Sequence, residues 1–227
     1  MQGSGLGPLL FLIYILDLKP VCKINILSKY ADDLSQLCPQ YSPSDLVGEF
    51  SHIVRWAEDN RLIINRSNTK EIMFRRPSLR HYIPPPPLMQ IEQVEEAKLL
   101  RILLTPTLSM QSHVKYTISI LNKRLYLLNQ LRKQELNVSG LTEVFMALVV
   151  ARFQYALPAL AGQLSADDLC KVDAVFNKAR RWQLTSHTPY SADLIEQCDK
   201  HLFRAALNLT HCLHSILPPK KNMYGRN

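Results

Sequence analysis

The segment Lys29–Asp33, with the sequence KYADD, constrains the fold of this chain more than any other. A mainly apolar run at 24–27 precedes it, and a second short run at 34–38 follows it. Short apolar runs on both sides of a polar turn predict the two strands of a β-hairpin. Asp is favoured at turns because its side chain bonds to nearby backbone groups, so Asp32 and Asp33 are expected at the hairpin tip.

Two interpretations of these carboxylates are open from the local residues. The first is an ordinary hairpin turn, since turns of this composition are common. The second is a magnesium site, because hard divalent cations prefer carboxylate oxygens and Mg²⁺ often uses only one or two protein carboxylates. Two such ions about 3.5–4 Å apart can stabilise the attacking and the leaving oxygen of a phosphoryl transfer. Asp32 and Asp33 are therefore candidate metal ligands.

Segments on both sides of the hairpin distinguish these interpretations. The sequence QGSGLGPLLF occupies positions 2–11, NRLIIN positions 60–65 and TKEIMF positions 69–74. In this order around Tyr30–Asp33, the segments closely resemble the reverse transcriptases of non-LTR retrotransposons. The first segment resembles motif B of that family, the hairpin resembles motif C, and residues 60–74 resemble motif D.

The resemblance implies the chemistry of an RNA-directed DNA polymerase. It places Asp32 and Asp33 in the catalytic metal site, with Mg²⁺ as the expected cofactor and Mn²⁺ as its substitute. The implied partners are an RNA template, a DNA primer and deoxynucleoside triphosphates. The residues expected near the template or the incoming nucleotide are Gln2, Gly3, Ser4, Tyr30 and Ala31.

The segment that resembles motif D departs from the family pattern. In the family this turn usually carries Asn-x-x-Lys-Thr, whereas here Asn65 is followed by Asn68 at the place of the lysine. An amide cannot supply the proton or the charge of that lysine. Lys70 is the remaining candidate for this role, although neighbouring residues of a strand point to opposite faces.

Residues 96–102, EAKLLRI, resemble the family's motif E, the primer grip. The usual form there is Lys-aromatic-Leu-Gly, so Leu99 replaces the aromatic residue and Arg101 replaces the glycine. Glycine positions often have a backbone conformation that other residues adopt only at a cost. The replacement of this glycine by Arg101 is therefore expected to affect the placement of a primer.

From about Val114 onward the pattern becomes helical. Apolar residues recur at helical spacing along 118–131, and basic residues lie between them. This region resembles the helical thumb of the family, which would contact the primer duplex. The candidates for contacts with the nucleic-acid backbone are Lys115, Lys123, Arg124 and Lys133. A solvated basic face on a core helix is the alternative interpretation of each of them.

The composition adds information on partners and on the cellular compartment. A net charge of +8, from 27 Lys and Arg against 19 Asp and Glu, favours an acidic partner such as nucleic acid. The five cysteines show no paired spacing, which predicts reduced thiols in an intracellular protein of the nucleus or cytoplasm. The apolar run at 9–18 is too short to span a bilayer, so no membrane association is expected.

The expected fold class is α+β. Residues 1–107 are expected to form a partial reverse-transcriptase palm, an antiparallel sheet with helices that contains motifs B to E. Residues 108–227 are expected to form an all-helical thumb and C-terminal region. Individual helices are predicted from about Asp45 to Asn60, over 141–157, after Ser165 and over 191–207.

The resemblance begins after the family's fingers and after motif A, which supplies a further metal-binding aspartate. Met1 stands where a proline usually precedes Gln-Gly-Ser, so we expect a truncated or mispredicted open reading frame. The missing N-terminal fingers and palm portion is then the expected protein partner, and the chain alone is expected to lack polymerase activity. Two alternatives remain: a basic nucleic-acid-binding remnant without chemistry, and a product without a cellular role.

Overall fold

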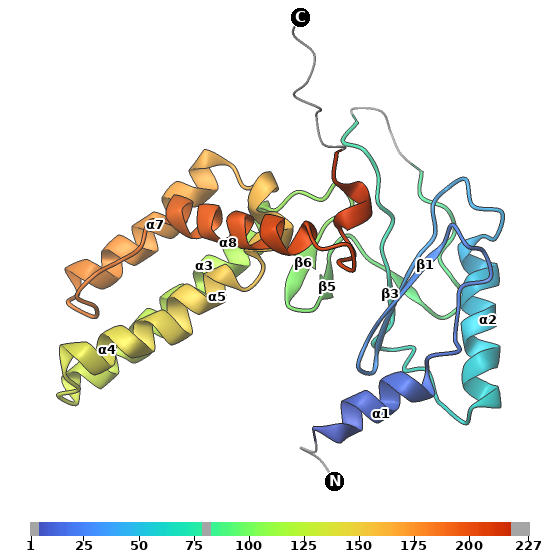
Figure 1. Cartoon of the computed structure of the whole chain (residues 1–227), viewed down its shortest axis with the longest axis horizontal. Coiled ribbons are helices and arrows are strands. Elements are labelled where there is room, and N and C mark those ends of the chain that lie inside the picture. The colour runs from blue at the N-terminus through green and yellow to red at the C-terminus, as the bar shows by residue number, and fades with distance from the viewer. Residues whose placement is uncertain (1–4, 79–82, 219–227) are drawn as a thin grey trace, which may run out of the picture. The chain divides into compact units, whose positions relative to one another are not determined.

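The chain divides into two compact units, which are described separately. A computed structural model of the protein (Figure 1) describes residues 5–78 and 83–218. The N-terminal unit comprises Met1–Met73 and Ser78–Glu95, and the helical unit comprises Phe74–Pro77 and Glu96–Asn227. The mixture of helices and short sheets agrees with the predicted α+β class. Residues 96–107 group with the helices, so the boundary between the units lies earlier than the predicted one.

In its described part, the N-terminal unit contains helices and small sheets. Its elements are α1 (Leu6–Tyr14), β1 (Ile26–Tyr30), β2 (Asp33–Leu37), α2 (Leu46–Asp59), β3 (Lys70–Glu71) and β4 (Glu92–Gln93). Strands β1 and β2 form the predicted antiparallel hairpin, with Ile26 opposite Leu37 and Tyr30 opposite Asp33. Strands β3 and β4 pair in parallel.

The sheets differ from the antiparallel palm sheet that we expected. The described strands form separate two-stranded sheets, and residues 62–65 form no strand. Arg61 has a φ of 56°, which turns the chain just after α2. Strand β3 pairs with β4 after a long connection that contains the prolines at 84–87, and parallel pairing requires such a crossover. Strand β3 covers only Lys70 and Glu71, and residues 72–74 form no strand.

Helix α2 organises the N-terminal unit through one buried face. Asp45 caps the helix by accepting the N–H of Gly48 at 2.8 Å, which confirms the predicted helix start. The buried residues of the helix are Glu49, Ile53 and Ala57, which are four residues apart and therefore share one face. A carboxylate thus lies in the face that the sequence pattern assigns to apolar side chains.

The Glu49 carboxylate is fully buried and accepts three hydrogen bonds. The backbone N–H groups of Val21 and Cys22 donate to it at 3.0 Å each, and the Asn25 side chain donates at 2.6 Å. Burial raises the pKa of Glu49, but the three hydrogen bonds lower it by more, so its pKa lies below the usual range. Glu49 thereby ties α2 to the segment that leads into β1.

In its described part, the helical unit consists of a short hairpin and a set of packed helices. The hairpin pairs β5 (Ala97–Leu99) with β6 (Ile102–Leu104). The longer helices are α3 (Gln111–Lys133), α7 (Ala166–Arg181) and α8 (Ser191–Ala206). Between α3 and α7 lie α4 (Val138–Phe145), the π-helical turn η1 (Met146–Val150), α5 (Ala151–Gln154), α6 (Leu157–Leu160) and the short turn η2 (Ala161–Gln163). The turn η3 (His214–Ile216) follows α8.

The core of the helical unit forms where α3, α7 and the stretch from α4 to α5 pack together. Leu121 and Leu125 of α3 are fully buried one helical turn apart. Phe176 of α7 contacts Phe145 and Phe153 edge to face, with ring centroids 6.1 and 5.9 Å apart. The helical pattern predicted for this region is therefore present, and its apolar face forms the core.

One described helical stretch, Val138–Gln163, is long and apolar enough to cross a membrane by length and composition alone. Leu141, Phe145, Val149 and Phe153 of this stretch are buried in the core against α3 and α7. One face of this stretch therefore belongs to the core of the helical unit. The absence of membrane association stays a prediction.

Replacing Glu49 with Gln is expected to destabilise the N-terminal unit by about 3 kcal/mol at neutral pH, because three donors lose a charged acceptor. The contribution of Glu49 is present above the ordinary glutamate pKa of about 4.3 and is lost as the pH falls through the lower pKa of the folded state. The difference between Glu49→Gln and the wild type should therefore shrink below about pH 4. Urea unfolding followed by Trp56 fluorescence, in a Trp182→Phe background, measures this difference.

Glu58→Gln is the matched control, because Glu58 lies exposed on the same helix. It should change the free energy of unfolding by less than about 0.5 kcal/mol. An equal loss in the two variants would contradict the role assigned to the buried carboxylate. A difference for Glu49→Gln that stays constant down to about pH 3 would contradict it as well.

Candidate functional site

The tip of the β1–β2 hairpin carries the predicted catalytic residues. Tyr30 and Asp33 form the last pair of the hairpin, so Ala31 and Asp32 make up a two-residue loop. Ala31 has a φ of 50°, in the left-handed region. Two-residue hairpin loops commonly need this conformation at the first loop position, where glycine is preferred. Ala31 adopts it at a cost on the order of 1 kcal/mol, and such strained residues cluster at functional sites.

The carboxylates of Asp32 and Asp33 are both exposed. Within residues 5–78 and 83–218, no group donates a hydrogen bond to either carboxylate or forms an ion pair with it. Free carboxylate oxygens held by a hairpin fit Mg²⁺ or Mn²⁺ in donor type. No third His, Cys, Asp or Glu among the described residues joins them in a group that could hold a metal. The described residues therefore supply two carboxylates to a possible divalent-metal site at the hairpin tip.

The structure brings together part of the predicted nucleotide and template site. Tyr30 and Ala31 lie at the hairpin tip beside Asp32 and Asp33, and the Tyr30 side chain is 63% exposed. Gln2, Gly3 and Ser4 lie outside the described residues, so their predicted roles remain predictions.

Lys29 fastens the hairpin to helix α1, a role that the sequence analysis missed. Its Nζ donates to the carbonyls of Ile15 and Leu16, just after the C-terminal end of α1. Burial lowers the pKa of Lys29, while the charge of Asp17 acts in the opposite direction. A lysine at a helix C-terminus satisfies carbonyls that have no partner within the helix. The bond holds β1, and with it the hairpin tip, against α1.

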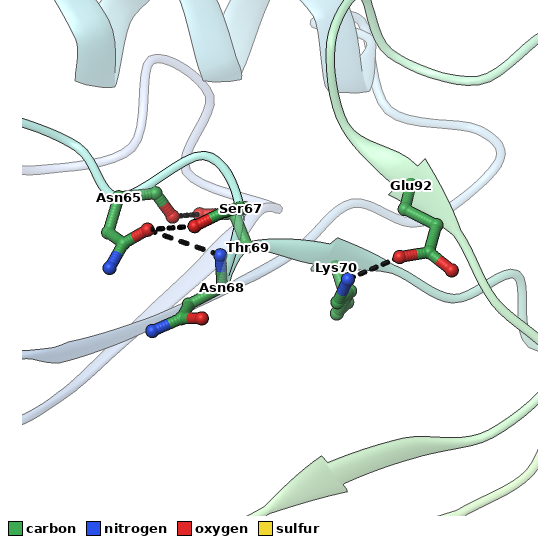
Figure 2. Close-up of polar contacts among 6 residues, drawn as sticks. All are labelled: Asn65, Ser67, Asn68, Thr69, Lys70 and Glu92. Carbon is green, nitrogen blue, oxygen red and sulfur yellow. Dashed lines mark hydrogen bonds and ion pairs between the residues drawn. The ribbon is translucent and has the colours of Figure 1, made fainter.

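Lys70, the candidate of the motif D segment, is paired with an acidic side chain. Lys70 lies in β3 and its ammonium forms an ion pair with Glu92 of β4 (Figure 2). Both side chains are substantially exposed, so the pair contributes little to stability. Lys70 would have to leave Glu92 before its ammonium could meet a phosphate.

The turn before Lys70 is closed by Asn65 (Figure 2). Its Oδ1 accepts from the Ser67 hydroxyl at 2.7 Å and from the Asn68 N–H at 3.3 Å. Its backbone carbonyl accepts from the Thr69 hydroxyl at 2.9 Å. Asn side chains favour turns through such local bonds. Asn68, which stands where the family has lysine, thus takes part in a turn through its backbone.

The four basic residues predicted on α3 do not share one environment. Arg124 donates to the carbonyl of Leu148 in the π-helical turn η1. Burial and the charges of Arg152 and Arg101 lower the pKa of Arg124. Lys115 and Lys133 are exposed, and no contact brings either of them to these arginines in the part of the unit that the structure describes.

Tyr116 marks a second part of the same basic region. Lys98 donates to its hydroxyl at 3.1 Å, and that bond lowers the pKa of Tyr116 together with the charges of Lys98, Arg152 and Lys123. Lys98, Arg101 and Arg152 were not among the binding candidates of the sequence analysis. The local signal for Arg101 was its place at a glycine position of motif E. We call the following five residues the cation cluster: Lys98, Arg101, Lys123, Arg124 and Arg152.

Comparison with known proteins gives one informative match. No family model and no solved structure matches the chain. The chain is 24% identical over 253 aligned residues to a Drosophila melanogaster protein described as "Probable RNA-directed DNA polymerase from transposon X-element". This distant homology supports a relationship to the reverse transcriptases. The predicted resemblance is confirmed at that general level.

The alignment covers 97% of this chain and 27% of the transposon polymerase. The chain thus spans about a quarter of the length of its reverse-transcriptase relative. The palm, the thumb, the individual motifs and the metal site are finer assignments than this match carries, and they remain predictions.

Replacing Ala31 with Gly is expected to stabilise the N-terminal unit by about 0.5–1 kcal/mol, because glycine adopts a positive φ without steric cost. Ala31→Val is the opposing control, since a β-branched residue tolerates this conformation least, and it should lower stability. Urea unfolding followed by Trp56 fluorescence measures both variants. A loss of stability in Ala31→Gly would show that the tip does not store this strain.

Proposed function

We propose that this chain is the part of a retrotransposon reverse transcriptase that carries two of its catalytic carboxylates and its thumb. The parent reaction is RNA-templated DNA synthesis from deoxynucleoside triphosphates. The observation that carries the proposal is the pair of unengaged carboxylates at a strained two-residue hairpin tip. The distant homology to a transposon RNA-directed DNA polymerase supports it.

In this proposal, each residue of the hairpin tip has a distinct role. Asp32 and Asp33 hold Mg²⁺, with Mn²⁺ as a substitute, and a bound ion supplies Lewis-acid stabilisation of phosphate oxygens. Tyr30 and Ala31 lie beside the incoming nucleotide, and Gln2, Gly3 and Ser4 approach the template and that nucleotide. Lys29 keeps the tip in place through α1.

We further propose that the carboxylates act with a third one from another polypeptide segment, the fingers and motif A portion of the parent protein. In the family, motif A supplies a further metal-binding aspartate, and the described residues of this chain bring no third carboxylate to the tip. The surface of α1 supports a partner segment, because no residue of this helix is buried. Its large exposed apolar side chains include Leu6, Leu9, Leu10 and Ile13. Exposed apolar patches of this kind mark contact surfaces.

A second candidate function is nucleic-acid binding without catalysis. The cation cluster favours it, because none of its members forms an ion pair with an acidic residue that the structure describes. Both candidate functions go with a location of the protein in the nucleus or cytoplasm. All five cysteines are free, which supports a reducing compartment.

A primer-extension assay tests the catalytic proposal. The substrates are an RNA template with an annealed DNA primer and deoxynucleoside triphosphates, with Mg²⁺ or Mn²⁺. The chain alone should give no extension. A mixture with a separately produced fingers and motif A portion of the X-element polymerase should extend the primer, and Asp32→Asn should reduce extension about 100-fold or more.

Asp59→Asn is the matched control, because Asp59 is an exposed carboxylate at the end of α2 in the same unit. It should leave extension unchanged. Extension that survives Asp32→Asn, or that the chain performs alone, would contradict the proposed site. Failure of the mixture, under conditions in which the full X-element polymerase is active, would contradict the partner assignment.

A further inference from the structure

An unbroken run of four prolines lies between β3 and β4 in the N-terminal unit. The run occupies positions 84–87, with Ile83 before it and Leu88 after it. We call residues 83–88 the proline segment. The segment forms no helix or strand, and every residue from 83 to 87 is exposed. Each proline ring fixes its own φ and biases the preceding residue toward an extended backbone, so the run favours a polyproline II helix.

The protein itself makes little use of the backbone of the proline segment. Proline has no N–H, so the four prolines offer only carbonyl acceptors. The side-chain amide of Gln93 donates to the Pro85 carbonyl at 3.3 Å. No described residue donates to the carbonyls of the other three prolines. These carbonyls are therefore open to donors from another molecule.

A buried carboxylate fixes the C-terminal end of the proline segment. Glu71 of β3 is only 7% exposed, and its Oε2 accepts the Leu88 N–H at 2.9 Å. Its Oε1 accepts the side-chain amide of Gln93 at 3.0 Å, and the same amide reaches Pro85. The segment is thus held at two points. A segment ordered in advance loses less conformational entropy when a partner binds, which increases its affinity.

The proline segment presents apolar surface at a regular spacing. A polyproline II helix has three residues per turn, so Pro84 and Pro87 share one edge, and Ile83 and Pro86 share the next. Ile83 is 78% exposed, and Met89, directly after the segment, is 85% exposed. Residues 83–89 contain no charged side chain. A partner would therefore recognise this surface by apolar packing and by donors to the free carbonyls.

We propose that the proline segment binds a protein domain that has an aromatic-lined groove, of the SH3, WW or EVH1 kind. Such grooves take up Pro-x-x-Pro segments, whose preformed polyproline II helix costs little entropy to bind. Pro84 and Pro87 are the one pair of prolines in the segment with this spacing. The inference goes beyond the proposed function, because it requires neither a metal ion nor a nucleic acid.

Isothermal titration calorimetry of the full chain tests the proposal with three purified probes: an SH3 domain, a WW domain and an EVH1 domain. At least one probe should bind. Replacing an aromatic residue of that probe's groove with Ala should abolish the binding. Pro84→Ala combined with Pro87→Ala should weaken it about tenfold or more, because two rings that fill the groove are lost.

Pro85→Ala combined with Pro86→Ala is the matched control. It removes the same number of prolines and the same stiffness from the segment, but it keeps Pro84 and Pro87. The control should therefore bind the probe about tenfold more tightly than the variant that lacks Pro84 and Pro87. Both double variants change exposed residues, so both should melt near the wild-type temperature. Asp32→Asn should bind the probe as the wild type does.

Three results would overturn the proposal. The first is the absence of binding to all three probes, as expected for a passive linker. The second is equal affinity of the two double variants, which would mean that stiffness or composition matters and the Pro-x-x-Pro edge does not. The third is binding that survives loss of the aromatic residue in the probe's groove. None of these results bears on primer extension, so the catalytic proposal is tested separately.

Discussion

The N-terminal unit depends on a buried negative charge whose partners are all hydrogen-bond donors. The Glu49 carboxylate holds the backbone of Val21 and Cys22 and the side chain of Asn25, directly before β1. Such a charge is stable inside a protein only while its donors remain in place. The position of the hairpin, and of the carboxylates at its tip, therefore follows from this one set of bonds together with Lys29 on α1.

Local elements with clear end signals were predictable from the sequence. Asp45 caps α2, and Ser165 forms a reciprocal cap with the carboxylate three residues later, as the patterns of those helices indicated. The burial of Glu49 was not predicted, because a charged residue on an apolar stripe is normally assigned to the surface. Arg152 was missed for another reason: its proximity to Arg124 arises from the tertiary packing of α3 and α5 and is invisible in any local pattern.

The two candidate sites share one physical feature. Each includes a two-residue hairpin loop in which residues other than glycine have a positive φ: Ala31 in the β1–β2 hairpin, and Leu100 with Arg101 in the β5–β6 hairpin. Glycine would relax both loops at no steric cost. The first loop contains Asp32 and is followed by Asp33, and the second contains Arg101. Both loops thus present charged side chains on short supports.

The central claim is that the carboxylates of Asp32 and Asp33 bind a divalent cation, and Mn²⁺ titration of the isotope-labelled chain tests it most directly. Paramagnetic broadening of the amide resonances reports which residues lie near the bound ion. The account predicts that the amides from Tyr30 to Leu34 broaden first, and that Asp32→Asn combined with Asp33→Asn abolishes this effect. Broadening that begins at another carboxylate, or that persists in the double variant, would contradict it.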